Sequence, residues 1–296
     1  DGSDHTQPFG VMPLQWKQAI TILIVSFIVL NIVMILNLWL RDRPGDQFAL
    51  SSSQKSEIIE SLRQKGVIVE VEIPKEGKPQ ALLEVALPKL DEKKILQNFF
   101  GKDSRPILSH THDGRKYTHG NEQLIITDHG FITYFNSDDS VIWPNLSREQ
   151  AEKEALAFMK ARRSMQENAI LDRVTYDDES KAYLLEYVSY HDGFFIQNSY
   201  ATVLVTPSGI KGYYQCWLEP LGYVGKKRSV LSPLTAILRV INERSTAEPI
   251  IITGIQQGYY SKLYDADRWQ VAPVWKIQLG NKETYYVNAY TGELEQ

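Results

Sequence analysis

AITILIVSFIVLNIVMILNLWL, residues 19–40, is an apolar stretch of 22 residues without a charged side chain. A helix needs about 20 residues to cross the hydrocarbon core of a bilayer. Trp16 and Lys17 precede the stretch. Arg41 and Arg43 follow it, so basic groups fall at both headgroup levels. The stretch therefore predicts one transmembrane helix over 19–40 that contacts the lipid bilayer.

Two alternatives fit this stretch less well. A cleaved signal peptide has an apolar region of about 7–15 residues and a small-residue cleavage site after it. The stretch is longer, and LRDRP (40–44) offers no such site. A helix buried in a protein core rarely stays apolar on every side for so many turns. An uncleaved anchor is the prediction that remains.

The orientation of this helix depends on its flanks. Basic residues in short loops favour the cytoplasmic side. Lys17 alone precedes the helix, whereas Arg41 and Arg43 follow it. The larger number of basic residues after the helix slightly disfavours a cytoplasmic N-terminus. A short arm before a large domain is, in contrast, the usual layout of an exported, anchored domain. The residues alone leave the orientation open.

The arm before the helix, residues 1–18, has an unusual beginning. DGSDHTQPFGV (1–11) is unlike a membrane-proximal segment, and Met12 followed by PLQWKQ is a more ordinary start. We interpret 1–11 as non-native or as the product of a misplaced start, and they take no part in the fold prediction.

The remaining chain has the composition of a folded domain. Charged residues make up 23% and aromatic residues 11%, which allows a sizeable core. The net charge of −4 gives no electrostatic case for nucleic acid. Cys216 is the one cysteine, so no intrachain disulfide can form. It lies among aromatic residues in YYQCWLEP, and we expect it to pack as a small hydrophobic residue.

The first half of this domain alternates helix and strand signals. A serine at 53 or 56 is expected to cap a helix that ends at Gly66. Residues 122–136 predict a hairpin that turns at Asp128-His129-Gly130. The other expected elements are strands at 67–73 and 80–87 and a short helix at 91–100.

The second half shows the same order twice. Ser147, with Gln150 three residues later, has the signature of a capping box. Ser232 caps a second expected helix with Pro233 at its first position. Each helix precedes three strand-like segments, at 171–177, 182–193 and 200–214 and at 251–263, 271–280 and 283–295.

This order predicts an α+β fold, with helices packed on small antiparallel sheets and an internal duplication at a spacing of about 85 residues. The predicted organisation is an arm at 1–18, a transmembrane helix at 19–40, a linker at 41–56, an N-terminal α+β lobe at 57–146, and helix-plus-sheet repeats at 147–231 and 232–296.

Candidate chemistry is sparse. His110 and His112 would share one face of a strand and, with His119 nearby, could bind zinc. The other interpretation is a polar loop, because glycines surround these histidines and no cysteine or glutamate completes a ligand set. A nucleophile elbow and a phosphate-binding loop are absent from the sequence. No catalytic, cofactor-binding or metal-binding residue is predicted.

Aromatic side chains concentrate in the two repeats. Adjacent strand residues such as Tyr285 and Tyr286 must face opposite ways. About half of these rings are therefore expected in the core, and the others could line an interaction surface, where Tyr and Trp are favoured.

Polar side chains interrupt the apolar stretch. A polar group in lipid gains about 1 kcal/mol by hydrogen bonding to another helix. A chain with one membrane helix must find that helix on a partner, although single polar residues are also tolerated near helix ends. The candidate partner-binding residues are Ser26, Asn31 and Asn37.

Four segments carry a family resemblance. WKQAITILIVSFIVLNIVMILNLWL (16–40) ends in Leu-Trp-Leu, and LQNFFGKD (96–103) and LIITDHGFITYFN (124–136) follow it. The C-terminal segment is VAPVWKIQLGNKETYYVNAYTGEL (271–294). Together they resemble the YycI (WalI) proteins of low-GC Gram-positive bacteria. Tails like YYVNAYTGEL also occur in PepSY-like domains, and the chain length favours YycI over the larger YycH.

This resemblance implies a protein anchored in the cell membrane, with a cytoplasmic N-terminus and an extracytoplasmic α+β domain. Such proteins regulate the essential sensor histidine kinase WalK (YycG), which with its response regulator WalR (YycF) controls cell-wall metabolism, and they act with a YycH-like partner. No catalytic residue belongs to the family. The alternative function is a PepSY-like binding module that inhibits an extracellular protease.

Overall fold

The computed structural model describes residues 23–34, 52–64, 66–244, 249–260, 262, 264 and 266–295. The chain divides into two compact units, Asp1–Gln47 and Phe48–Gln296. In the first unit, residues 23–34 are helical and their side chains are exposed. No helix within the described ranges is long and apolar enough to span a membrane. The rest of the predicted anchor lies outside these ranges, so the transmembrane helix stays a prediction.

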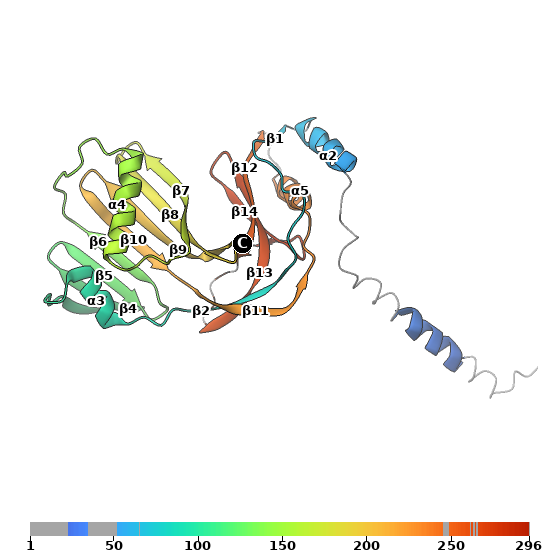
Figure 1. Ribbon diagram of the computed structural model, residues 1–296, viewed down its shortest axis with the longest axis horizontal. Helices are drawn as coiled ribbons and strands as arrows, with labels where there is room; N and C mark the ends of the chain where they lie inside the picture. The colour runs from blue at the N-terminus through green and yellow to red at the C-terminus, as the bar shows by residue number, and fades with distance from the viewer. Residues whose placement is uncertain are drawn as a thin grey trace, which may run out of the picture. The chain divides into compact units, whose positions relative to one another are not determined.

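The second unit is mostly β-sheet with a few helices, which agrees with the predicted mixture of α and β structure (Figure 1). Its described helices are α2 (Ser52–Gln64), α3 (Glu92–Phe100), α4 (Arg148–Ala161) and α5 (Pro233–Glu243). Its described strands are β1 (Val67–Val69), β2 (Gln80–Ala86), β3 (Ile107–Thr111), β4 (Gly114–His119), β5 (Glu122–Thr127), β6 (Ile132–Asn136), β7 (Ala169–Asp177), β8 (Ala182–His191), β9 (Phe194–Thr206), β10 (Gly209–Cys216), β11 (Glu219–Arg228), β12 (Ile250–Tyr260), β13 (Arg268–Leu279), β14 (Thr284–Asn288) and β15 (Leu294–Glu295).

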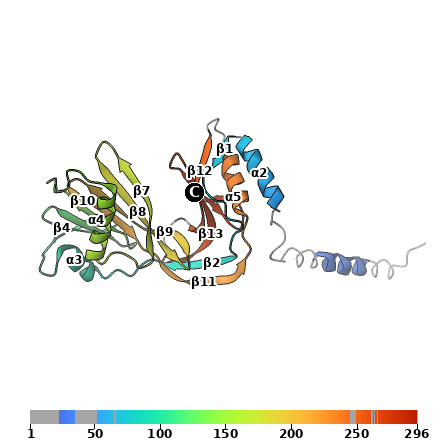
Figure 2. The same cartoon turned by 45° about the horizontal axis from the view of Figure 1, so that its top comes forward.

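Eight of these strands form an antiparallel sheet, which we call the large sheet. Its order is β3-β4-β5-β6-β10-β9-β8-β7. A second group, the C-terminal sheet, consists of β1, β12, β13, β14 and β15, with β2 and β11 added to the first part of β13. Strand β9 joins the two groups, because its Phe195 and Ile196 pair in parallel with Gly258 and Tyr259 of β12. Figure 2 shows β9 between them.

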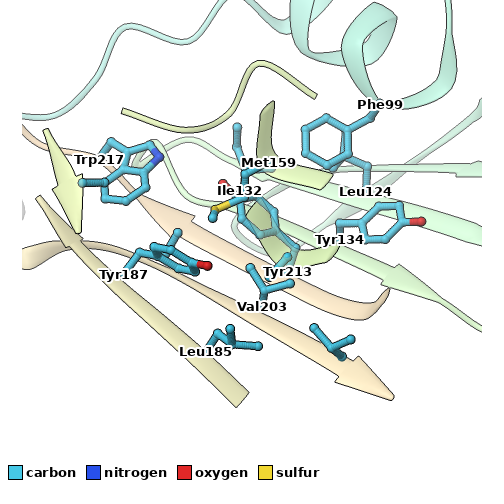
Figure 3. Close-up of a cluster of buried hydrophobic side chains, with 14 of the residues drawn as sticks. Phe99, Leu124, Ile132, Tyr134, Met159, Leu185, Tyr187, Val203, Tyr213 and Trp217 are labelled. Carbon is cyan, nitrogen blue, oxygen red and sulfur yellow. The ribbon is translucent and has the colours of Figure 1, made fainter. Parts of the chain in front are cut away.

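One face of the large sheet packs against α3 and α4 and forms the main core (Figure 3). Ser147 caps α4 by accepting a hydrogen bond from the backbone N–H of Gln150 at 3.2 Å, which confirms the predicted cap. Ala151 and Ala155 of α4 are fully buried, so the helix backbone lies close to the strands. The strands contribute large side chains at alternate positions, among them Leu124, Tyr134, Tyr213, Val203 and Leu185.

Helices α2 and α5 belong to the core of the C-terminal sheet. Ser232 accepts a hydrogen bond from the backbone N–H of Thr235 at 3.1 Å, and Pro233 follows it at the start of α5, as predicted. Leu234, Ile237 and Val240 of α5 are buried in one cluster with Leu62 of α2 and Trp275 of β13. These contacts hold α5 on the sheet that follows it in the sequence.

Several element boundaries differ from the predictions. The expected strand at 200–214 is a hairpin, in which β9 and β10 meet at a turn that includes Pro207 and Gly209, the latter with φ of +108°. Helix α2 begins at Ser52, inside the predicted linker 41–56. The strand expected at 67–73 ends at Val69. Strand β11 was not predicted, because its two glycines and terminal basic residues resemble a loop.

The predicted N-terminal lobe, 57–146, is divided between the two sheets. Strand β1 pairs in parallel with β12, and β2 pairs with β11 and β13. Only the part from α3 to β6 belongs with the large sheet. In the second half, α4 precedes antiparallel strands β7 to β10 and α5 precedes β12 to β15. The internal duplication itself stays a prediction.

Candidate protein-binding surface

The face of the large sheet opposite α3 and α4 is the surface most suited to binding a partner. In β9 and β10, fully buried residues alternate with half-exposed ones, as expected when one face of a sheet lies on a core and the other does not. The core positions Leu124, Tyr134, Tyr213, Val203 and Leu185 are paired neighbours across five strands. Their sequence neighbours must therefore point to the opposite side.

Those neighbours form two parallel rows, which we call the open face. The first row crosses seven strands and has no charged residue. The second has an uncharged centre between charged ends. Their members, in the order of the strands, are Thr118, Gln123, Phe135, Gly212, Leu204, Leu184 and Thr175, and then Lys116, Ile125, Thr133, Tyr214, Thr202, Glu186 and Arg173.

Charge is confined to the margins of the open face. At one margin, Arg173 of β7 and Glu186 of β8 form a bidentate ion pair, in which Nη2 donates to Oε1 at 3.0 Å. At the other margin lies Lys116 of β4. Between these ends the side chains are threonine, glutamine, aliphatic or aromatic. Depletion of charge at the centre is the compositional signal that separates interface cores from ordinary surface.

Apolar groups stand out from this uncharged surface. The side chains of Phe135 and Leu184 are exposed, at 48% and 36%. Tyr214 is held between Phe131 and Tyr200, with ring centroids 5.8 and 5.6 Å away. Burial raises the pKa of Tyr214 and that of Tyr200 above the ordinary tyrosine value, so both stay neutral in the physiological range. The face therefore offers pre-formed aromatic contacts without charge to desolvate.

The predicted partner-binding residues lie in the first unit. Ser26 and Asn31 are within the helical residues 23–34, and their side chains are exposed. The Nδ2 of Asn31 donates to the carbonyl oxygen of Phe27 at 2.9 Å, so one of its two N–H groups is already bonded inside its own helix. Asn37 lies outside the described residues. The partner-binding role of all three stays a prediction.

The histidine-rich segment is a β-hairpin. His110 lies in β3 opposite Arg115, and His119 lies at the far end of β4 opposite Glu122. His112 is in the turn, and all three imidazoles are exposed. In the described part of the chain, no group of three or more histidine, cysteine or acidic residues is placed to hold a metal ion. The interpretation as a polar loop was wrong, because residues 107–111 and 114–119 pair as antiparallel strands around the turn at 112–113.

Some aromatic residues of the repeats lie in the core, and others are only half-buried. Tyr213, Tyr259 and Trp275 are buried. As predicted, Tyr285 and Tyr286 face opposite ways: the first packs on the cluster below α5, and the second stacks on Tyr260 with ring centroids 4.3 Å apart. Cys216 is fully buried in an apolar cluster, as expected. The open face was missed, because the pairing of distant strands that builds it is not visible in any local segment.

Comparison with known proteins identifies the chain. The family model described as "YycI protein" matches residues 45–290, which is most of the sequence. The chain belongs to the YycI family. Membership in this family makes it a regulatory accessory protein of the WalK/WalR two-component system and not a known type of enzyme.

A solved structure shares the fold. It is the crystal structure of an uncharacterized protein from Eubacterium rectale ATCC 33656, with a TM-score of 0.54 at 13% sequence identity. The match covers 82% of this chain and 98% of that one. At this identity the likeness concerns the fold alone. No protein with curated annotation matches the chain.

Proposed function

We propose that this YycI-family protein is a membrane-anchored regulator that binds a sensor histidine kinase of the WalK type, together with a YycH-like protein, and adjusts its activity. Its N-terminus is cytoplasmic, residues 19–40 cross the cell membrane, and the second unit is extracytoplasmic. It has no enzymatic activity of its own. Contacts that are stronger with one kinase state than with the other shift the kinase between its states.

The uncharged open face carries this proposal. A regulator that acts by binding needs a surface that a partner can desolvate at low cost, and a polar group without a new partner costs about 1–3 kcal/mol on burial. The first row of the open face has no charge across seven strands, and Phe135 and Leu184 are exposed on it. A second part of the proposal can be tested separately. In this part, the membrane helix contacts the kinase through Ser26, Asn31 and Asn37.

The test is crosslinking and co-purification of the full-length chain from membranes. Phe135→Asp and Leu184→Asp place a charge on the open face, and we expect each to reduce the recovery of the kinase or the YycH-like protein about tenfold or more, since a buried unpaired charge costs several kcal/mol. Leu221→Asp is the matched control. Leu221 of β11 is equally exposed, at 47%, but lies away from the open face.

Three outcomes would contradict the proposal. If Phe135→Asp and Leu221→Asp gave equal recovery of the kinase and the YycH-like protein, the open face would not be the binding surface. If the output of kinase-controlled genes stayed unchanged after replacement of Ser26, Asn31 and Asn37 by leucine, the membrane helix would have no role in kinase contact. Recovery of an extracellular protease in place of a kinase would instead support the protease-inhibiting alternative.

A further inference from the structure

A small pocket on the other side of the large sheet has an excess of positive charge. It lies where the start of α3 and the end of α4 meet strands β6 and β10, and its volume is about 180 Å³. Lys89, Lys94, Arg162 and Arg163 line it, and Asp91 is the one carboxylate among its lining residues. We call it the cationic pocket.

Two of these cations are already engaged. Lys94 forms an ion pair with Asp91 at 3.0 Å. Arg162 donates to the carbonyl oxygen of Phe99 and forms an ion pair with Glu122 at 3.3 Å. The side chains of Lys89 and Arg163, in contrast, form no ion pair within the described residues, and both are exposed at the rim. The pocket therefore has two cations available to a ligand.

A nearly buried amide also faces this pocket. Gln215 lines it and is 6% exposed. Its Oε1 accepts a hydrogen bond from the hydroxyl of Tyr213, which also lies 3.4 Å from the carbonyl oxygen of Ser164. Its Nε2 has no hydrogen-bond partner among the described residues. This donor keeps contact with solvent at the pocket that Gln215 lines, so it is available to a ligand.

The backbone at the rim is held in an unfavourable conformation. Arg163 directly follows the cap residue of α4 and has φ of +51°, in the left-handed region. Its N–H bonds to the carbonyl of Lys160, and the N–H of Ser164 bonds to that of Met159, the pattern of a helix end at which glycine is preferred. An arginine at this position is a strained residue at a pocket, and such residues cluster at functional sites.

From these observations we propose that the cationic pocket binds a phosphate group. A phosphate carries a charge of about −1.5 to −2 near neutral pH and several acceptor oxygens, which match two free cations and one amide donor. The floor is apolar and includes Phe99 and Ile132, both drawn in Figure 3, so it can accept a few attached carbon atoms. The volume is below the ~300–1,000 Å³ of sites for drug-sized ligands, so the pocket encloses a phosphate group and a few attached atoms but not a whole nucleotide.

Calorimetric titration of the full chain, purified in a neutral detergent at constant ionic strength, tests this proposal. The probes are inorganic phosphate, glycerol 1-phosphate and a glycerol phosphodiester. Binding of inorganic phosphate identifies a free anion, binding of the monoester a small metabolite, and binding of the diester alone a polymer or a lipid headgroup. Each of the three supports the site. No binding of any probe overturns it.

Three variants assign the binding to the pocket. Arg163→Gly and Lys89→Gln each remove one charged hydrogen-bond donor and are expected to weaken binding about tenfold. Arg148→Gln removes an exposed arginine from the opposite end of the same helix and should leave binding unchanged. Arg163→Gly also relieves the left-handed strain, so its unfolding temperature should be unchanged or higher, which separates lost binding from lost structure. Equal affinity of Arg163→Gly and Arg148→Gln refutes the assignment. Because the open face is elsewhere, kinase recovery does not bear on this result.

Discussion

Lys276 is the residue whose removal we expect to loosen the junction between the two sheets. It lies on β13 of the C-terminal sheet, and its Nζ is 2.5 Å from Oδ2 of Asp172 on β7 of the large sheet. The side chain of Lys276 is 3% exposed and that of Asp172 is 17% exposed. Beside this pair, Nε2 of Gln256 on β12 donates to the hydroxyl of Tyr190 on β8 at 2.8 Å. The two contacts tie the sheets together through polar groups in an aromatic surrounding.

The expected cost of Lys276→Met follows from this geometry. Methionine keeps the aliphatic stem and removes the charge, which leaves the carboxyl group of Asp172 without its partner. Removing one member of a buried ion pair costs about 3–5 kcal/mol. Because Asp172 keeps some access to water, we expect about 3 kcal/mol, at the lower end. For a unit of this size, that corresponds to a fall of about 6–12 °C in the unfolding temperature.

Urea unfolding of the full chain, followed by tryptophan fluorescence, measures this cost. The series contains Lys276→Met, Asp172→Asn and the double variant, so that the interaction energy of the pair can be separated from the effects of each change. Arg239→Met is the control, since Arg239 and Glu243 form an exposed pair on α5 that should contribute under about 1 kcal/mol. If the double variant lost the sum of the two single losses to within about 0.5 kcal/mol, the pair would not be coupled and the reasoning would be refuted.

Three further predictions concern single positions. An added Cβ at Gly258 would lie 2.3 Å from the ring of the buried Phe195, so Gly258→Ala should destabilise the junction of β12 and β9 by about 1–3 kcal/mol. Urea unfolding measures this loss, and an unchanged midpoint would contradict the contact. Burial raises the pKa of Tyr187 from 10.0 to about 12. The protonated side chain therefore stabilises the folded protein fully below pH 10, and this contribution to the free energy of unfolding is lost as the pH rises to 12. Tyr187→Phe should flatten the fall of the unfolding free energy over that range, and an unchanged slope would contradict the shift. Burial also raises the pKa of the Cys216 thiol to about 12, so a maleimide at pH 8 should label this cysteine only after unfolding. Rapid labelling of the folded protein would show instead that the thiol is accessible.

Features set by neighbouring residues could be predicted from the sequence. The caps at Ser147 and Ser232 depend on a side chain and a backbone N–H three residues later, so the local sequence contains all the information needed. The hairpin at 122–136 is similar, because the turn at Gly130, with φ of +81°, lies between two short strands that pair directly. The position of Cys216 in an apolar cluster also follows from its aromatic neighbours in the sequence.

Features set by distant residues could not be predicted. Strand β1 was recognised as a strand-like run, but its partner β12 lies in the last part of the chain. The open face requires the register of seven strands, of which β6 and β10 are joined only through α4 and β7 to β9. The cationic pocket brings Lys89, Arg163 and Gln215 together from three separate segments. Asp172 reaches Lys276 from an irregularity in the pairing of β7 with β8, and no local pattern marks such a position.

The pairing of early strands with late ones limits when this unit can fold during synthesis. The hydroxyl of Tyr290 donates to the carbonyl oxygen of Gln80 across 210 residues, and the amide of Gln257 bonds to the backbone of Lys78 across 179. The early strands β1 and β2 therefore have no partners until β12 and β11, respectively, have left the ribosome. Contacts at such separations slow folding, because the loop between them must close first. In the meantime β1 and β2 expose unpaired edges, so a nascent or truncated chain should depend on chaperones and be readily degraded.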